Sequence, residues 1–129
     1  MPPSTVIPEL PYPNVREAVA WLCKSFGFSE RLQIGNHRAQ LVFGEGSIVV
    51  TQGHDVNAAF SIMVRVEDAN AHHEHVKRSG AKIVSPPADY PYGERQYVVE
   101  DPGGHRWTFS QTIADIDPSS WGGVLHSQT

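Results

Sequence analysis

Hydrophobic spacing along the first half of the chain predicts a strand, a helix and then three strands. A short apolar run over residues 6–10 is interrupted by Pro8, which favours a strand at a sheet edge. Apolar residues then recur at helical spacing between Asn14, a good N-cap, and Gly27, a natural helix stop. Three further strands are predicted, separated by glycine-containing turns: residues 28–34, 38–43 and 47–52.

The same order of elements repeats in the second half, which indicates a duplicated unit. Residues 60–66 predict a strand, and a helix is expected between Asp68 as N-cap and Gly80 as stop. A strand opens at residues 82–84, and a proline-rich loop is expected over residues 86–92. We therefore expect a single domain over residues 1–129, with these parts: a first module over 5–53, a second module over 58–112 and a C-terminal tail over 113–129.

The last two predicted strands face each other across a tight turn at residues 101–104, which read Asp-Pro-Gly-Gly. Residues 105–111 then alternate, and Trp107 and Phe109 fall on the face that enters the core. The opposite, wetter face carries polar side chains: Arg106, Thr108 and Ser110. A functional site of this hairpin would therefore lie on the wetter face.

Composition narrows the range of partners and compartments. The chain has 129 residues and a net charge of −4, without a basic stripe, which argues against nucleic acid and membrane partners. No apolar run approaches the roughly 20 residues that span a bilayer, and the first residues do not resemble a secretory signal. Cys23 is the only cysteine, so we expect no internal disulfide and a cytoplasmic location. The mild acidic excess is compatible with a cationic ligand.

The duplicated unit ends in Asp101-Pro102-Gly103-Gly104-His105-Arg106-Trp107, and in this it resembles the vicinal oxygen chelate superfamily. The stretch ahead of that hairpin, residues 92–95, is most similar to the glyoxalase/bleomycin resistance protein-like branch. The resemblance implies an α+β fold of two βαβββ modules, whose curved mixed sheets form an open cup with the helices outside. It also implies a homodimer. Whether the two modules of a cup come from one chain or from two stays open.

Metal-using members of the superfamily hold one divalent ion in the cup with His, Gln or Glu side chains. Counting from the helix stops carries those positions onto four residues that are not strong ligands: Ile7, Val50, Ser61 and Thr108. A divalent ion needs several converging donors, so we predict no metal site and no cofactor. A second cluster with metal-ligand side chains lies on the second predicted helix: His72, His73 and His75. We interpret this cluster as helix surface, because the helices are expected outside the cup.

The cup face would hold a small organic ligand by apolar contact and a few polar groups. The candidate ligand-binding residues on it are Glu9, Ser61, Met63, Tyr92, Arg95, Tyr97, Arg106, Thr108 and Ser110. Tyr97 joins this set only if the strand register allows it, and Arg95 has the alternative of a structural ion pair. Tyr90, Tyr92 and Trp121 could cover a flat ligand by stacking.

Two functions of different kinds follow from these residues. The leading hypothesis is a metal-free protein that binds an aromatic or cationic small molecule, as in antibiotic sequestration. The alternative is a glyoxalase- or dioxygenase-like lyase or oxidoreductase with a displaced metal site or with acid–base chemistry through Glu9 or Glu100. An interaction scaffold is a third interpretation. The sequence identifies no catalytic residue.

Overall fold

The computed structural model describes residues 6–54 and 61–124 and contains two four-stranded sheets. The first sheet has the order β1-β4-β3-β2, with β1 (Glu9–Tyr12), β2 (Ser29–Ile34), β3 (Arg38–Phe43) and β4 (Gly46–Gln52). The second has the order β5-β8-β7-β6, with β5 (Ser61–Arg65), β6 (Lys82–Tyr90), β7 (Glu94–Glu100) and β8 (Arg106–Thr112). In each sheet the first strand is parallel to its neighbour and the other pairs are antiparallel. The predicted α+β fold with two βαβββ modules is confirmed.

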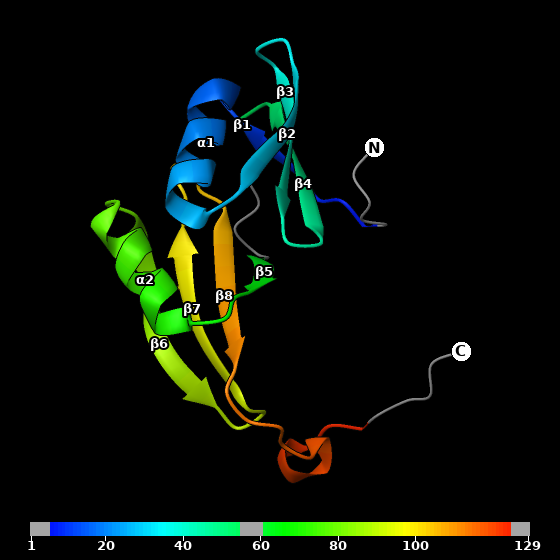
Figure 1. Ribbon diagram of the computed structural model, residues 1–129, viewed down its shortest axis with the longest axis vertical. Coiled ribbons are helices and arrows are strands. Elements are labelled where there is room, and N and C mark those ends of the chain that lie inside the picture. Colours follow the sequence, from blue (N-terminus) through cyan, green and yellow to red (C-terminus); the bar gives the residue numbers. More distant parts are fainter. Residues whose placement is uncertain (1–5, 55–60, 125–129) are drawn as a thin grey trace.

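One helix accompanies each sheet, and both helices lie on the same side of the molecule (Figure 1). They are α1 (Val15–Trp21), which continues into the π-helical turn η1 (Leu22–Phe26), and α2 (Ala69–Arg78). A short 3-10 helix, η2 (Pro118–Trp121), lies beyond the lower end of the second sheet. In the part of the chain that the structure describes, no helix combines the length and apolar composition that crossing a bilayer needs.

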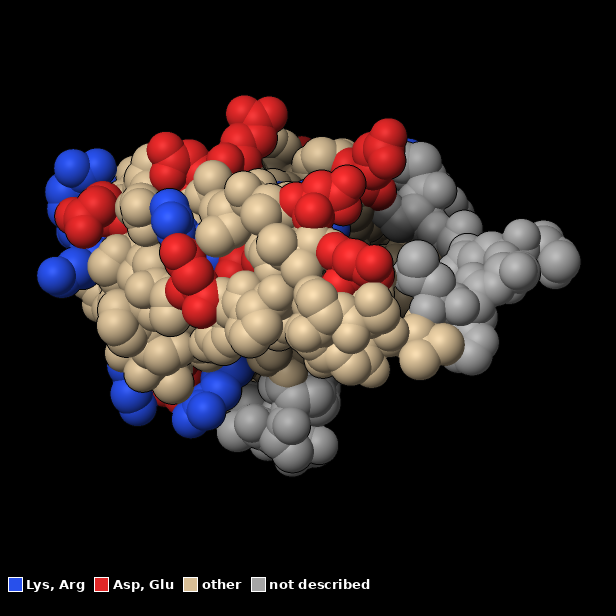
Figure 2. Space-filling model, turned by 90° about the horizontal axis from the view of Figure 1, so that it is seen from below, with Lys and Arg blue, Asp and Glu red and all other residues tan. Residues whose placement is uncertain are grey.

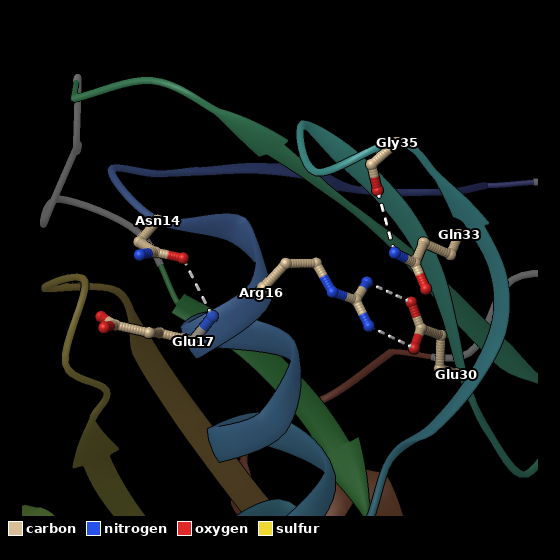
Figure 3. Close-up of polar contacts among 6 residues, drawn as sticks. All are labelled: Asn14, Arg16, Glu17, Glu30, Gln33 and Gly35. Atoms are coloured by element: carbon tan, nitrogen blue, oxygen red, sulfur yellow. Dashed lines mark hydrogen bonds and ion pairs between the residues drawn. The ribbon is translucent and has the colours of Figure 1, made fainter.

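The helix ends follow the predicted capping residues. Asn14 Oδ1 accepts a hydrogen bond from the Glu17 backbone N–H at 3.1 Å, and Asp68 Oδ1 caps α2 in the same way. Gly27 ends the first helical segment in the left-handed conformation, with φ of 93°. Figure 3 shows the Asn14 cap beside the ion pair in which Arg16 on α1 holds both carboxylate oxygens of Glu30 on β2. This pair fastens α1 to the edge of the first sheet.

The neighbouring turn between β2 and β3 carries a bond of its own, also visible in Figure 3: the side-chain amide of Gln33 donates to the Gly35 carbonyl at 3.1 Å. Gly35 adopts a positive φ of 54°, which a tight turn needs and glycine accepts readily. The predicted turn at this position is therefore confirmed.

Side chains from both modules form one continuous hydrophobic core. Phe26, at the end of η1 in the first module, packs edge-on against Trp107 and Phe109 of β8, with ring centroids 5.2 and 5.0 Å away. All three side chains are fully or almost fully buried. Because burial of aromatic rings dominates core energetics, each module depends on the other for its stability.

A buried carboxylate links the two modules at the turn between β7 and β8. Asp101 Oδ2 accepts hydrogen bonds from Tyr12 Oη at 2.5 Å and from Trp107 Nε1 at 2.9 Å. Its Oδ1 accepts from the backbone N–H groups of Gly103 and His105, at 3.0 and 2.9 Å. A Cβ on Gly103 would lie 2.5 Å from the Tyr12 ring, so the close approach of the modules requires glycine there.

Two predicted elements are wrong in extent. The first strand covers Glu9–Tyr12 instead of residues 6–10, and Pro11 is tolerated because β1 is an edge strand that pairs only with β4. The expected loop at residues 86–92 is mostly strand, because β6 continues to Tyr90. Register shifts between Ser85 and Ala88 leave the two intervening prolines outside the ladder. The predicted module limits at residues 5 and 58 lie outside the described residues.

Candidate functional site

The register of the second sheet decides which side chains face away from α2. Trp107 and Phe109 point into the core, so their neighbours on β8 point to the opposite face, which we call the open face. The open face is built from three adjacent strands: Ser61, Met63 and Arg65 of β5, Arg106, Thr108 and Ser110 of β8, and Glu94, Gln96, Val98 and Glu100 of β7.

Small hydroxyl side chains form the floor of the open face. Ser61 Oγ and Thr108 Oγ1 lie 3.2 Å apart and share a hydrogen bond. Thr108 and Ser110 are buried although they face away from the helix, while Met63 beside them is 62% exposed. The floor is therefore polar and recessed between longer side chains of the neighbouring strands.

A chain of hydrogen bonds runs across the lower half of the open face. Tyr92 Oη donates to Gln96 Oε1 at 3.2 Å, and Gln96 Nε2 donates to Ser110 Oγ at 3.0 Å. Ser110 Oγ donates in turn to Glu94 Oε1 at 2.8 Å. A hollow of about 300 Å³ lies over this chain, lined by Met63, Arg65, Glu94 and Ser110. A ligand in the hollow would meet an apolar side chain, a cation and a carboxylate.

Three aromatic side chains border the lower end of the open face, and we call them the aromatic rim: Tyr90, Tyr92 and Trp121. The rings of Tyr90 and Tyr92 are stacked with centroids 5.5 Å apart, and Trp121 meets Tyr92 edge-on at 5.6 Å. Trp121 remains 41% exposed. The tail that carries it is held by the Gly93 carbonyl, which accepts from the backbone N–H groups of Ile113 and Ala114.

The structure brings together five of the predicted ligand-binding residues on the open face and a sixth at its rim: Ser61, Met63, Arg106, Thr108, Ser110 and Tyr92. Three others lie elsewhere. Glu9 lies on the first sheet, where Arg38 holds its carboxylate at 2.9 Å. Arg95 forms an ion pair with Asp89 at 2.7 Å, on the opposite face of β7. Its predicted alternative of a structural ion pair is therefore realised, with a different carboxylate.

Tyr97 also lies elsewhere, and its predicted place in the cup is wrong. It pairs with Phe109 in the ladder and is therefore fully buried under α2. There its hydroxyl meets His72 Nδ1 at 2.5 Å. Burial raises the pKa of Tyr97, so the phenol stays protonated at neutral pH.

The four positions tested for metal ligands do not converge on a site for an ion. Ile7 precedes β1, and Val50 is fully buried on the core face of β4, which corrects its expected place in the cup. Ser61 and Thr108 are neutral hydroxyls that bond to each other. Among the described residues, no three His, Cys, Asp or Glu side chains lie close enough together to hold a metal ion. The donors present therefore do not fit a divalent ion.

Two of the three histidines of α2, His72 and His75, contact main-chain carbonyls of the first module. His72 Nε2 contacts the Phe26 carbonyl at 3.1 Å, and His75 Nε2 contacts the Lys24 carbonyl at 2.9 Å. Burial is the main cause that lowers the pKa of His72. These contacts satisfy carbonyls at the end of η1, which have no partner within the helix. The histidine of the predicted turn acts in the same way, since His105 Nε2 lies 2.7 Å from the Pro11 carbonyl.

Sequence reasoning missed four residues of the open face, and it named a fifth, Glu100, only for acid–base chemistry. The four are Arg65, Glu94, Gln96 and Val98. The turn at residues 101–105 pairs Glu100 with Arg106, so counting outward along β7 and β8 would have placed Gln96 beside Ser110. Arg65 follows Ser61 and Met63 at every second position of β5, so strand alternation alone would have placed it on the open face.

Comparison with known families identifies the class of this fold. A family model described as Glyoxalase/Bleomycin resistance protein/Dioxygenase superfamily matches residues 6–109. The match covers most of the chain, so the chain belongs to this superfamily, and the resemblance noted from the sequence is confirmed.

Solved structures of the same fold include proteins of several kinds. TioX from Micromonospora sp. ML1 is 33% identical, with a TM-score of 0.73 over 88% of this chain and 100% of that chain. The fosfomycin resistance protein FosX from Listeria monocytogenes is 15% identical, with a TM-score of 0.71 over 86% of this chain and 94% of that chain. A glyoxalase/bleomycin resistance protein/dioxygenase from Alicyclobacillus acidocaldarius is 13% identical, with a TM-score of 0.70 over 88% and 95%. The last two likenesses show the fold alone.

Curated relatives match only part of the chain. Uncharacterized proteins of Mycobacterium bovis and Mycobacterium tuberculosis are each 29% identical over 68 residues, which is 53% of this chain. The match covers 45% and 40% of these two proteins. The chain therefore spans less than half the length of the curated relatives it matches.

Proposed function

We propose that this chain binds a small aromatic or cationic organic molecule on the open face of its second sheet, without a metal and without bond chemistry. The observation that carries the proposal is the aromatic rim joined to the hollow by a continuous chain of hydrogen bonds. Aromatic side chains bind flat ligands by stacking, while a few placed polar groups fix their orientation.

The distribution of charged side chains favours a ligand with a cationic part at this end of the molecule. Figure 2 shows Asp and Glu side chains spread over the face seen from below, with Lys and Arg mainly toward its margins. Glu94, which lines the hollow, adds a carboxylate to the site itself. The acidic side chains of this face would attract a ligand with a cationic group, and Glu94, which lies in the hollow with Arg65, would be its partner there.

Members of the superfamily include resistance proteins, and FosX is one of the structures that share this fold. The donors at the usual metal positions do not fit a divalent ion, which favours binding over metal-assisted catalysis here. We therefore propose that the site sequesters an antibiotic-like molecule in the cytoplasm.

A thermal-shift screen of the untagged protein tests the proposal. The panel combines flat aromatic antibiotics with pyrenemethanol as a simple aromatic probe. A ligand that binds the folded state alone stabilises it by about 2.7 kcal/mol at a hundred times its Kd, so the melting temperature should rise. The absence of a shift with every compound, or one tightly bound metal ion per chain by elemental analysis, would overturn the proposal.

The aromatic rim provides a matched pair of variants for this screen. Trp121→Ala removes a stacking surface, and the loss of about 0.5–1.5 kcal/mol should weaken probe binding about 2- to 12-fold. Val84→Ala truncates an exposed apolar side chain of similar exposure, 38%, on β6 away from the rim. Equal affinities of the two variants would show that the rim does not hold the ligand.

We also propose that the chain forms a homodimer. Several large apolar side chains have substantial exposure on the two sheets, and a second copy of the chain is the partner that could cover them: Leu32 and Ile34 on β2 and Met63 on β5. Burial of such side chains in an interface is the usual source of dimer stability.

A further inference from the structure

The upper end of the open face contains an arginine whose Nε has no hydrogen-bond partner in the part of the chain that the structure describes. Arg106 begins β8 and lies in register between Ser61 on β5 and Glu100 on β7. Its Nε is buried and has no hydrogen-bond acceptor among the described residues. The adjacent Glu100 carboxylate is directed to Lys82 instead, at 3.4 Å.

Arg106 differs in this respect from Arg16, Arg31, Arg38 and Arg95, which all bind acceptors of this chain. Arg16, Arg38 and Arg95 each bind a carboxylate, at 2.6 to 2.9 Å. Arg31 donates to Gln40 at 2.7 Å. A buried guanidinium N–H without an acceptor costs free energy, so such a group points to an acceptor that the folded chain does not supply.

Two hydroxyls beside Arg106 add to its donor capacity. Ser61 and Thr108 form a hydrogen bond with each other, in which one of them donates and the other only accepts. Each hydroxyl carries one hydrogen, so among the described residues one donor of the pair has no side-chain acceptor. The guanidinium and this hydroxyl lie on the same face of adjacent strands.

We infer that Arg106, together with the Ser61–Thr108 hydroxyl pair, binds an anionic group of the ligand, such as a carboxylate, sulfonate or phosphate. This inference rests on the proposed function and defines the ligand further. Guanidinium groups bind planar oxyanions with charge-assisted hydrogen bonds, which are stronger than neutral ones. The anion would satisfy the buried Nε and this hydroxyl donor together.

The length of β8 sets the distance between this anion position and the aromatic rim. Arg106 and Thr112 are the ends of β8, and Thr112 pairs with Glu94, close to Tyr92 in the rim. Six residues of strand cover about 20 Å. The ligand would therefore be elongated, with an aromatic part over the rim and an acidic group at the far end. The surface between them contains Met63 and Val98 and suits an apolar spacer.

Pyrene alkanoates and their methyl esters test this geometry. Pyrenedodecanoate can span the distance, whereas pyrenebutanoate is too short to reach both ends. We expect the long acid to bind at least about tenfold more tightly than its methyl ester, equivalent to about 1.4 kcal/mol, and the short acid to show no such advantage. Titrations would follow pyrene fluorescence below the micelle concentration.

Variants of Arg106 test whether this arginine causes the tighter binding of the long acid relative to its ester. Arg106→Gln should abolish the advantage of the long acid over its ester while the ester affinity stays unchanged, which also reports that the variant is folded. Arg106→Lys should retain part of the advantage, because it keeps the charge and loses the planar geometry. Arg65→Gln tests the other cation of the open face: Arg65 lines the hollow, so its loss can change the affinities of acid and ester together, and their ratio should stay unchanged. Arg78→Gln, exposed on α2, is the control that should change neither affinity.

The outcomes separate this inference from the proposed function. Binding of the long ester with no advantage for the acid would overturn the anion site and leave the proposed aromatic site in place. An advantage that disappears in Arg65→Gln and persists in Arg106→Gln would also overturn it. Failure of every pyrene compound to bind would contradict both.

Discussion

At the scale of single residues, Asp101 determines how the two modules meet. The carboxylate is buried and accepts four hydrogen bonds, two from side chains and two from the backbone of its own turn. Burial and then the charge of Asp101 raise the pKa of Tyr12, so the phenol remains a donor at neutral pH. The Asp101 carboxylate is therefore surrounded by four hydrogen-bond donors, and its two oxygens accept from all of them.

Asp101→Asn should destabilise the fold markedly. The amide nitrogen replaces one acceptor with a donor, and at least one buried N–H or O–H then lacks a partner. Each such group costs about 1–3 kcal/mol, so we expect the free energy of unfolding to fall by about 2–4 kcal/mol in urea titrations.

Asp89→Asn provides the control for that measurement. Asp89 is exposed and pairs with Arg95 at the surface, where an ion pair contributes about 0–1 kcal/mol. If the two variants lost the same stability, Asp101 would not be the link that the hydrogen bonds indicate.

At the scale of elements, α2 is fixed to the first module by histidine contacts with carbonyls. His72 is the more buried of the two histidines involved and lies between the Phe26 carbonyl and the Tyr97 hydroxyl. Burial, with a smaller contribution from nearby His75, lowers the pKa of His72. The folded protein therefore resists protonation of a side chain that the unfolded chain protonates near pH 6.5.

This linkage predicts a loss of stability on acidification. The contribution of His72 is fully present above about pH 6.5 and is lost as the pH falls below that value, with a slope of at most about 1.4 kcal/mol per pH unit. The free energy of unfolding, measured by urea titration at several pH values between about 7 and 5, should fall less steeply with decreasing pH for His72→Gln than for the parent protein. His37→Gln, in an exposed turn, should leave the slope unchanged.

Elements with local signals could be predicted from the sequence, and those set by tertiary pairing could not. The Asn14 and Asp68 caps and the Gly27 stop lie where expected, because each depends on a few neighbouring residues. The extension of β6 depends on its pairing with β7. The two prolines form no ladder pairs, but the pairing on either side of them keeps the chain extended. The proline pattern alone favours a loop.

The candidate site was predictable to the same degree. Alternation along β8 placed Thr108 and Ser110 on the open face, because strand periodicity is local. The burial of Tyr97 under α2 and the hydrogen bond from Ser110 to Glu94 depend on the register between β7 and β8. A shift of one residue would reverse every side chain of a strand, so this part required the structure.

At the scale of the whole molecule, the two sheets are not closed within one chain. Their edge strands carry exposed apolar side chains, of which Met63 on β5 is the most exposed of the open face, at 62%. Stable dimers cover such patches with an interface of about 800 Å² on each partner. The proposed homodimer would thereby complete the walls of the open face.

Light scattering coupled to gel filtration tests the dimer. We expect a mass twice the 14.2 kDa of one chain, because a second copy covers the apolar edge strands. Leu32→Lys places a charge in that interface and should shift the protein toward the monomer, with an unchanged circular dichroism spectrum.

Ile116→Lys is the matched control, since Ile116 is exposed on the tail and not on a sheet. Its mass should remain that of the dimer. A monomeric parent protein at micromolar concentration would contradict the proposed assembly.

The core shared by both modules has a consequence for biosynthesis. Phe26 and Phe28 belong to the first module, yet both pack against Trp107, which the ribosome adds about eighty residues later. During translation we expect these rings to lack their contact with Trp107 until β8 has left the exit tunnel. We therefore expect the core of the first module to reach its final packing only after nearly the complete chain has been synthesised.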